Sequence, residues 1–259
     1  MFRTRRTFAA VLGAVAVLLI SCGSPGVTDS DSAAQTPDIT VFAAASLTAT
    51  FTELADDFET ENPGVGVTLN FAGSSDLVTQ LTQGAPADVF ASADTANMTK
   101  AVDAGLVNTD PAPFATNVLT IVTAPGNPQN VTSFADLADP DILTVVCAPQ
   151  VPCGSATASI EDATGITIPA VSEESAVTDV LGKVTSGQAD AGLVYVTDAA
   201  GAGDRVTTVP FPESAEAVNT YPIAVLAGSD HTDTASDFVA WVTGDMGRRV
   251  LTEAGFTQP

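Results

Sequence analysis

The stretch VFAAASLTATF (residues 41–51) passes from an apolar strand through alanines and a serine into an amphipathic helix. We expect the strand at residues 39–43 and the helix at about 46–60, with the Ser46 hydroxyl capping its first turn. Buried strands usually carry larger side chains than alanine. The small residues therefore predict a close approach of the backbone to another group. That group would meet Ser46 and the free N–H groups of the first helical turn.

The same alternation of strands and helices continues along the chain. Further strands are expected at 65–71, 88–92, 118–123, 143–147, 191–194 and 221–226. Further helices are expected at 74–84, capped by Ser74 or Ser75, at 94–104, 155–162 and 175–186, and as one C-terminal helix around residues 238–251. A strand–helix–strand series favours parallel strands with helices on both faces of the sheet. We therefore predict an α/β protein made of two α/β units.

The chain is strongly acidic. Its 259 residues carry 31 aspartates and glutamates against 8 lysines and arginines, which gives a formal charge of -23. Such a chain repels the phosphates of nucleic acid, so we expect no nucleic-acid partner. It also has few cations to offer to an anionic ligand.

The N-terminus is predicted to be an export signal. Arg3, Arg5 and Arg6 precede an apolar run at residues 8–20, which is too short to span a membrane comfortably. The run ends in LISC, which resembles a bacterial lipobox. We therefore expect a signal peptide at residues 1–21, a lipidated Cys22, and a flexible polar tether up to residue 37. The alternative is an ordinary signal peptide with an incidental cysteine, and the adjacent arginines leave twin-arginine export open.

Two further cysteines, Cys147 and Cys153, form an even pair in a chain that we expect to be exported. This predicts a disulfide that closes a short loop. Two reduced, buried thiols are the alternative.

The sequence lacks the common signatures of catalysis. Its single histidine, His231, lies in a polar run, and no G-x-S-x-G elbow, phosphate-binding loop or G-x-G-x-x-G motif is present. Neither cysteine of the pair has a histidine at zinc-site spacing. Adjacent acidic residues such as Asp56 and Asp57 point apart on a helix, which indicates solvated faces. We therefore predict a binding protein that is not an enzyme and has no cofactor.

Several predicted helices begin at a small or hydroxyl residue just after a strand. Ser46 follows AAA, Ser74 follows FAG, and Gly154-Ser155 follows PC. Each site offers free N–H groups and the positive end of a helix dipole. Two or more such ends in one cleft would bind an anion without any formal positive charge. Plain helix capping is the alternative at each position.

Five motifs together resemble a known family. ITVFAAASL (39–47), FAGSSDL (71–77), GAPADVFASAD (84–94), GLVYVTDA (192–199) and YPIAVL (221–226) are similar, in order and spacing, to the substrate-binding proteins of bacterial molybdate ABC transporters. The resemblance implies a type II periplasmic-binding-protein fold. Two α/β lobes, each with a mostly parallel sheet, would be joined by two crossover strands. Residues 38–117 plus 221–259 would form lobe 1, and residues 118–220 lobe 2.

The resemblance also implies five residues that hold a tetrahedral oxyanion in the cleft by its oxygen atoms, without direct ligation of the metal. Ser46 and Ser74 would supply hydroxyl and N–H groups, Cys153 and Val177 their N–H groups, and Tyr195 its hydroxyl. Cys153 departs from the family, which usually has alanine there, and a disulfide at this position would stiffen or shift the loop. None of the five offers a carboxylate that could accept a proton from phosphate, so we expect preference for a fully deprotonated oxyanion.

The function implied by this resemblance is capture of molybdate, and also of tungstate. The chain would be a monomeric lipoprotein on the outer face of the cytoplasmic membrane, delivering the anion to a permease driven by a cytoplasmic ATPase. The alternatives are a binding protein for another oxyanion or an organic anion, an exported hydrolase using Ser46 or Ser74 with His231, and an adhesin without a small ligand.

Overall fold

Two five-stranded sheets form the framework of the protein in this computed structural model, which describes residues 38–107 and 109–259. Their strand orders are β2-β1-β3-β10-β4 and β7-β6-β8-β5-β9. The first sheet contains β1 Ile39–Ala44, β2 Val67–Ala72, β3 Val89–Ala91, β4 Ala112–Asn117 and β10 Asn219–Val225. The second contains β5 Leu119–Thr123, β6 Thr144–Cys147, β7 Ser172–Glu174, β8 Ala191–Tyr195 and β9 Thr207–Val209.

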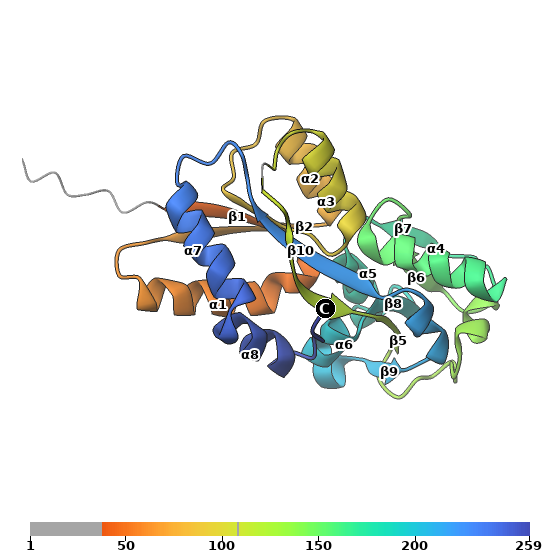
Figure 1. Ribbon diagram of the computed structural model, residues 1–259. Coiled ribbons are helices and arrows are strands. Elements are labelled where there is room, and N and C mark those ends of the chain that lie inside the picture. Colours follow the sequence, from red (N-terminus) through yellow and green to blue (C-terminus); the bar gives the residue numbers. More distant parts are fainter. Residues whose placement is uncertain (1–37, 108) are drawn as a thin grey trace, which may run out of the picture. The chain divides into compact units, whose positions relative to one another are not determined.

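Helices cover these sheets (Figure 1). Around the first sheet lie α1 Thr48–Glu61, α2 Ser74–Thr82, α3 Thr95–Asp103, α7 Thr232–Thr243 and α8 Asp245–Glu253. Around the second lie α4 Pro152–Thr164, α5 Val177–Thr185 and α6 Val196–Ala202. Short 3-10 turns occur at η1 Ala45–Leu47, η2 Phe134–Ala138, η3 Gly203–Arg205 and η4 Pro212–Glu216.

Strand β1 shows why its sequence is apolar at every position except Thr40. Ile39, Val41 and Ala43 face a core that includes residues of α1, α7 and α8, whereas Phe42 faces a second core built with α2 and α3. Side chains of a strand alternate between the faces of its sheet, so a strand covered on both sides has no solvent-facing position. Helices from distant parts of the sequence therefore fix β1 at the centre of the lobe.

Each sheet combines parallel and antiparallel pairs. Strand β1 runs parallel to β2 and β3, and β10 runs antiparallel to β3 and β4. In the second sheet β6 is parallel to β7 and β8, and β5 is antiparallel to β8 and β9. The sheets are thus mixed, because one strand of each, β10 in the first and β5 in the second, runs opposite to the other four.

The chain crosses from the first sheet to the second at Val118, between β4 and β5, and returns between β9 and β10. These crossings and the helical layers confirm the expected two-lobed α/β fold. The lobe limits 38–117 plus 221–259 and 118–220 stay a prediction, and β10 itself begins at Asn219.

Two predicted helix caps are wrong. Ser46 lies inside η1 and does not cap α1, since its hydroxyl lies 3.1 Å from that of Tyr221. Ser74 is the first residue of α2, and Gly73 at the N-cap position has no side chain to cap the helix. The Ser74 hydroxyl accepts a hydrogen bond from the Ala93 N–H. In both cases a partner from a distant strand or loop takes the hydroxyl that local capping would have used.

Other differences concern element limits. Helix α4 begins at Pro152 rather than near Ser155, because proline is favourable in the first helical turn. The expected single C-terminal helix is broken at Gly244 into α7 and α8. Strands β4, β7 and β9 and helix α6 were not predicted. Within the part of the chain that the structure describes, no helix combines the length and hydropathy needed to cross a membrane. The predicted signal peptide (1–21), Cys22 and the tether (22–37) lie outside the described residues.

Candidate functional site

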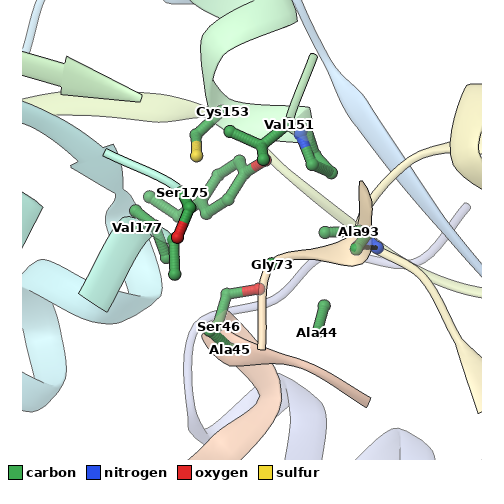
Figure 2. A pocket seen from close by; sticks show the side chains of 13 residues that line it. Ala44, Ala45, Ser46, Gly73, Ala93, Val151, Cys153, Ser175 and Val177 are labelled. Carbon is green, nitrogen blue, oxygen red and sulfur yellow. Dashed lines mark hydrogen bonds between the residues drawn. The ribbon is translucent and has the colours of Figure 1, made fainter. Parts of the chain in front are cut away.

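A small cavity lies where the two sheets approach each other, and all five predicted site residues line it. Figure 2 shows Ala44, Ala45 and Ser46 on one side, facing Val151 and Cys153 on the other. The thirteen residues described around it are all uncharged: Ala44, Ala45, Ser46, Gly73, Ser74, Ala93, Val151, Pro152, Cys153, Ser175, Ala176, Val177 and Tyr195. The cavity is small: it leaves ≈ 10 Å³ for the centre of a water-sized sphere, about what one water molecule requires, so a larger ligand requires its two walls to part.

The first sheet contributes two serine hydroxyls to the cavity. Ser46 follows β1 in η1, and Ser74 follows β2 at the start of α2. The parallel register of β1 and β2 pairs Ala44 with Ala72, so the two chain segments leave the sheet side by side. Among residues 38–107 and 109–259, each hydroxyl has one partner, Tyr221 for Ser46 and the Ala93 N–H for Ser74. Because Ser74 accepts that bond, its own proton is free to be donated to a ligand.

The second sheet contributes backbone N–H groups. Val177 is the first residue of α5 and Cys153 the second of α4. Within residues 38–107 and 109–259, the N–H groups of Ser74, Cys153 and Val177 donate to no other residue. They are the unpaired donors that every helix start presents, at the positive end of its dipole. Helix starts from both sheets therefore point into one neutral cavity, an arrangement suited to an anion.

Tyr195, the last residue of β8, adds a buried hydroxyl. Its side chain is 1% exposed, and its hydroxyl has no hydrogen-bond partner among the described residues. Burial, reinforced by the nearby Tyr221, Asp94 and Asp198, raises the pKa of Tyr195 well above its ordinary value. The phenol therefore keeps its proton and is available as a donor. A buried polar group without a partner is costly, which points to a ligand that accepts this proton.

The two walls of the cavity touch at Gly73. A Cβ atom built on Gly73 would lie 2.0 Å from the backbone oxygen of Ser175, which is far inside van der Waals contact. The backbone conformation of Gly73 is accessible to any residue (φ -59°, ψ 140°), so space alone requires glycine here. Together with Ala44 and Ala45, this explains the small residues after β1 and β2, which allow the backbones of the two lobes to approach closely.

Cys147 and Cys153 are joined by a disulfide, with their Cα atoms 5.6 Å apart. Cys147 ends β6 and Cys153 lies in the first turn of α4, so the bridge closes the loop that positions this helix start. The sulfur is engaged in the bridge, and what Cys153 offers to the cavity is its N–H group.

Sequence reasoning missed three residues that organise the site. Tyr221 contacts the Ser46 hydroxyl, Ala93 holds the Ser74 hydroxyl, and Gly73 permits the contact between the lobes. Tyr221 and Ala93 lie within the motifs YPIAVL and GAPADVFASAD, but no local pattern shows their distant partners. His231 is exposed at the start of α7, and the hydrogen bonds of the Ser46 and Ser74 hydroxyls go to other residues.

Comparison with known proteins places this architecture in a family. A model of the bacterial extracellular solute-binding proteins matches residues 39–257. A relative from Mycobacterium tuberculosis (strain ATCC 25618 / H37Rv), named molybdate-binding protein ModA, is 55% identical over 243 residues, which is 93% of each chain.

Two solved structures show the same fold. The sulfate-binding protein SubI of Mycobacterium tuberculosis superposes with a TM-score of 0.76 at 21% identity, covering 85% of this chain and 86% of that one. The periplasmic molybdate-binding protein of Azotobacter vinelandii superposes with a TM-score of 0.73 at 21% identity, covering 85% of this chain and 99% of that one. The match of the family model along nearly all of the described residues shows that the chain belongs to the bacterial extracellular solute-binding proteins.

Proposed function

We propose that this protein captures molybdate, and also tungstate, in the cavity between its lobes and delivers the anion to an ABC importer. The observation that carries the proposal is the meeting of unpaired N–H groups and the unpartnered Tyr195 hydroxyl in a small cavity without charged residues. These groups are donors, and a tetrahedral oxyanion presents only acceptors when fully deprotonated.

The energetics of such a site are favourable despite the acidic chain. A hydrogen bond from a neutral donor to a charged acceptor contributes roughly 1.5–3 kcal/mol. Several of them, from helix starts and hydroxyls, can exceed the cost of removing the anion from water. The net charge of -23 acts over a longer range and is screened by salt. Local dipoles therefore decide binding.

The relatives support the choice of ligand. The Mycobacterium tuberculosis relative with 55% identity carries the name of a molybdate-binding protein, whereas the sulfate-binding neighbour resembles this chain in fold at only 21% identity. Sulfate is therefore the competitor against which the proposal has to be tested.

We propose further that the protein is not an enzyme and uses no cofactor. A hydrolase built on Ser46 or Ser74 needs a base in hydrogen-bond reach, and His231 does not bond to either hydroxyl. We also propose that the protein is exported and is attached through a lipid on Cys22 to the outer face of the cytoplasmic membrane. There it would dock as a monomer to a permease with its ATPase.

Calorimetric titration of the purified protein with molybdate, tungstate, sulfate and phosphate tests the proposal. We expect one-to-one binding of molybdate and tungstate and no heat from sulfate or phosphate. Ser46→Ala and Tyr195→Phe should each weaken molybdate binding by about tenfold or more, because each removes one donor to a charged ligand. Tighter binding of sulfate than of molybdate would assign a different ligand, and unchanged affinity in both variants would move the site elsewhere.

A further inference from the structure

Tyr221 is the second of the two tyrosines in the chain, and it lies behind the cavity rather than in it. It belongs to β10, is 0% exposed, and its ring packs edge-on against Tyr195, Phe114 and Phe256. Its hydroxyl lies 3.1 Å from the Ser46 hydroxyl oxygen, across 175 positions of sequence. Tyr221 therefore touches a proposed binding residue without lining the cavity itself.

The direction of this hydrogen bond follows from the surroundings. Burial raises the pKa of Tyr221 well above its ordinary value, so the phenol keeps a proton that needs an acceptor. Among the described residues, the Ser46 hydroxyl is the partner at normal hydrogen-bond distance, and the Asn117 and Tyr195 side chains lie nearby. If Ser46 donated instead, the buried Tyr221 proton would lose its one partner at normal hydrogen-bond distance, which is unfavourable for a buried donor. The arrangement in which Tyr221 donates to Ser46 is therefore the more stable one.

This direction determines what Ser46 can offer. A serine hydroxyl has one proton and can accept through its oxygen. With Tyr221 donating to that oxygen, the Ser46 proton is the part of the hydroxyl left for the cavity. Without Tyr221, the rotation of the hydroxyl would no longer be fixed by that partner, so it could turn its proton away and present its oxygen to the ligand.

We infer that Tyr221 is a positioning residue that fixes the Ser46 hydroxyl as a donor and thereby excludes ligands that carry a proton of their own. The inference deepens the proposed function and rests on it. It assigns part of the selectivity to a residue that does not contact the ligand. A protonated phosphate would meet the proton of Ser46, where it needs an acceptor, whereas a fully deprotonated oxyanion accepts that proton.

A double-mutant cycle tests the inference. Tyr221→Phe keeps the ring and its edge-on packing and removes only the hydroxyl. We expect it to weaken molybdate binding by about three- to tenfold, the range of an ordinary hydrogen bond. We also expect the ratio of molybdate to phosphate affinity to fall. In the Ser46→Ala background, the same change should alter molybdate affinity less than about twofold, because its effect passes through Ser46. An equal loss in both backgrounds would overturn the inference and leave Tyr221 a structural role.

The Tyr195→Phe variant distinguishes a failure of this inference from a failure of the proposed function. That variant removes a hydroxyl that lines the cavity, so it should weaken molybdate whether or not Tyr221 orients Ser46. If wild type binds molybdate, and Ser46→Ala and Tyr195→Phe weaken it while Tyr221→Phe does not, the inference alone fails. If wild type binds none of the four anions, the proposed function fails and the inference fails with it.

A spectroscopic measurement keeps the test independent of how well Tyr221→Phe folds. Tyrosine labelled with carbon-13 at the hydroxyl-bearing ring carbon gives two resonances, which Tyr195→Phe assigns. We expect Ser46→Ala to shift the Tyr221 resonance in the unliganded protein, since its phenol loses the acceptor. An unmoved Tyr221 resonance would show that the two hydroxyls are not hydrogen-bonded and would overturn the inference.

Discussion

The two walls of the cavity present donors of different kinds. On the wall of the first sheet, the hydroxyls of Ser46 and Ser74 are held by Tyr221 and by the Ala93 N–H. On the wall of the second sheet, Cys153 and Val177 offer N–H groups, and the Tyr195 hydroxyl has no partner among the described residues.

This difference shows which parts of the site tolerate substitution. A backbone N–H at a helix start is positioned by the helix, so its side chain can change without moving the donor. A side-chain hydroxyl depends on its rotamer and on whatever holds that rotamer. The wall of the second sheet can therefore carry a valine and a disulfide-bonded cysteine, while the wall of the first sheet depends on particular serines and their distant partners.

The largest effect is expected for removal of one backbone donor. Val177→Pro deletes an N–H group at the first position of α5, where proline suits a helix and the preceding Ala176 is already extended (φ -144°, ψ 149°). We expect molybdate affinity to fall by about ten- to 150-fold, since a hydrogen bond of roughly 1.5–3 kcal/mol to a charged acceptor is lost. Val177→Ala keeps the N–H and should bind within about threefold of wild type. Equal binding by the two variants, measured by calorimetry, would show that this N–H does not contact the ligand.

The next effect concerns the contact between the walls. Gly73→Ala places a methyl group against the Ser175 carbonyl without straining the backbone, so we expect it to keep the lobes apart. Overpacking of about 1–3 kcal/mol would reduce affinity by up to about a hundredfold, with little change in unfolding. Gly182→Ala is the matched control, because no atom lies within 4 Å of its added Cβ. A drop in the unfolding midpoint of Gly73→Ala as large as its loss of binding would place the clash within a lobe instead.

Ser74→Ala tests a hydroxyl that has two tasks. The change removes a proposed ligand donor and leaves the Ala93 N–H without its acceptor. Ser74 is 1% exposed, so water cannot easily replace the lost partner. We expect about 1–3 kcal/mol of lost stability and several-fold weaker binding. The neighbouring Ser75→Ala removes a buried hydroxyl that has no partner among the described residues and should change both quantities little. Chemical unfolding and calorimetry on the pair measure the two tasks separately.

A smaller effect on binding is expected from the disulfide. Replacing both Cys147 and Cys153 with alanine keeps the N–H group at position 153, so affinity should stay within about threefold. Stability should fall by about 2 kcal/mol, the value that loop closure gives for a short loop. If affinity instead falls as far as in Val177→Pro, the bridge itself positions the loop, and the side chain matters on this wall too.

The smallest effect on binding is expected at Asp198, which does not line the cavity but makes stability depend on pH. Burial raises the pKa of Asp198 to about 7, while its carboxylate accepts the Tyr195 N–H. The folded state therefore holds this proton more tightly than the unfolded chain, where the pKa is near 3.8. Its contribution is fully present below about pH 4 and is lost as the pH rises to about 7.

Asp198→Asn keeps an oxygen acceptor for the Tyr195 N–H but does not titrate. The free energy of unfolding of wild type, relative to this variant, should fall from about pH 4 to about pH 7 and then level off. Urea unfolding at several pH values measures the difference. Taking the difference is necessary because Asp136 and Glu174, whose pKa values are lowered, change wild-type stability in the opposite direction. A constant difference would show that Asp198 titrates normally.

Much of the fold could be predicted from local patterns. The apolar run before Ser46 and the helical spacing of Phe51, Leu54 and Phe58 identify β1 and α1, since these patterns report which side chains must be buried. The short strands β7 (SEE) and β9 (TTV) escaped prediction because they are largely polar and only partly buried, whereas the equally short β3 (VFA) is apolar and fully buried.

The sequence by itself determined the donors that belong to helix starts. A helix that begins after a buried strand leaves its first N–H groups unpaired wherever it lies, so the local pattern is enough to make Ser74 a candidate donor. The motifs around Ser46, Ser74 and Tyr195 are also short stretches of sequence, and they were enough to indicate the family.

Only the tertiary structure decided how the hydroxyls are used. Ser46 meets Tyr221 because β10 returns to the first sheet after the chain has built the second, and Gly73 meets Ser175 because the lobes approach each other there. These contacts join residues about a hundred or more positions apart, and hydrophobic periodicity and capping preferences act over only a few residues. The caps predicted for Ser46 and Ser74 were wrong for this reason: distant partners took hydroxyls that local rules had assigned to the neighbouring backbone.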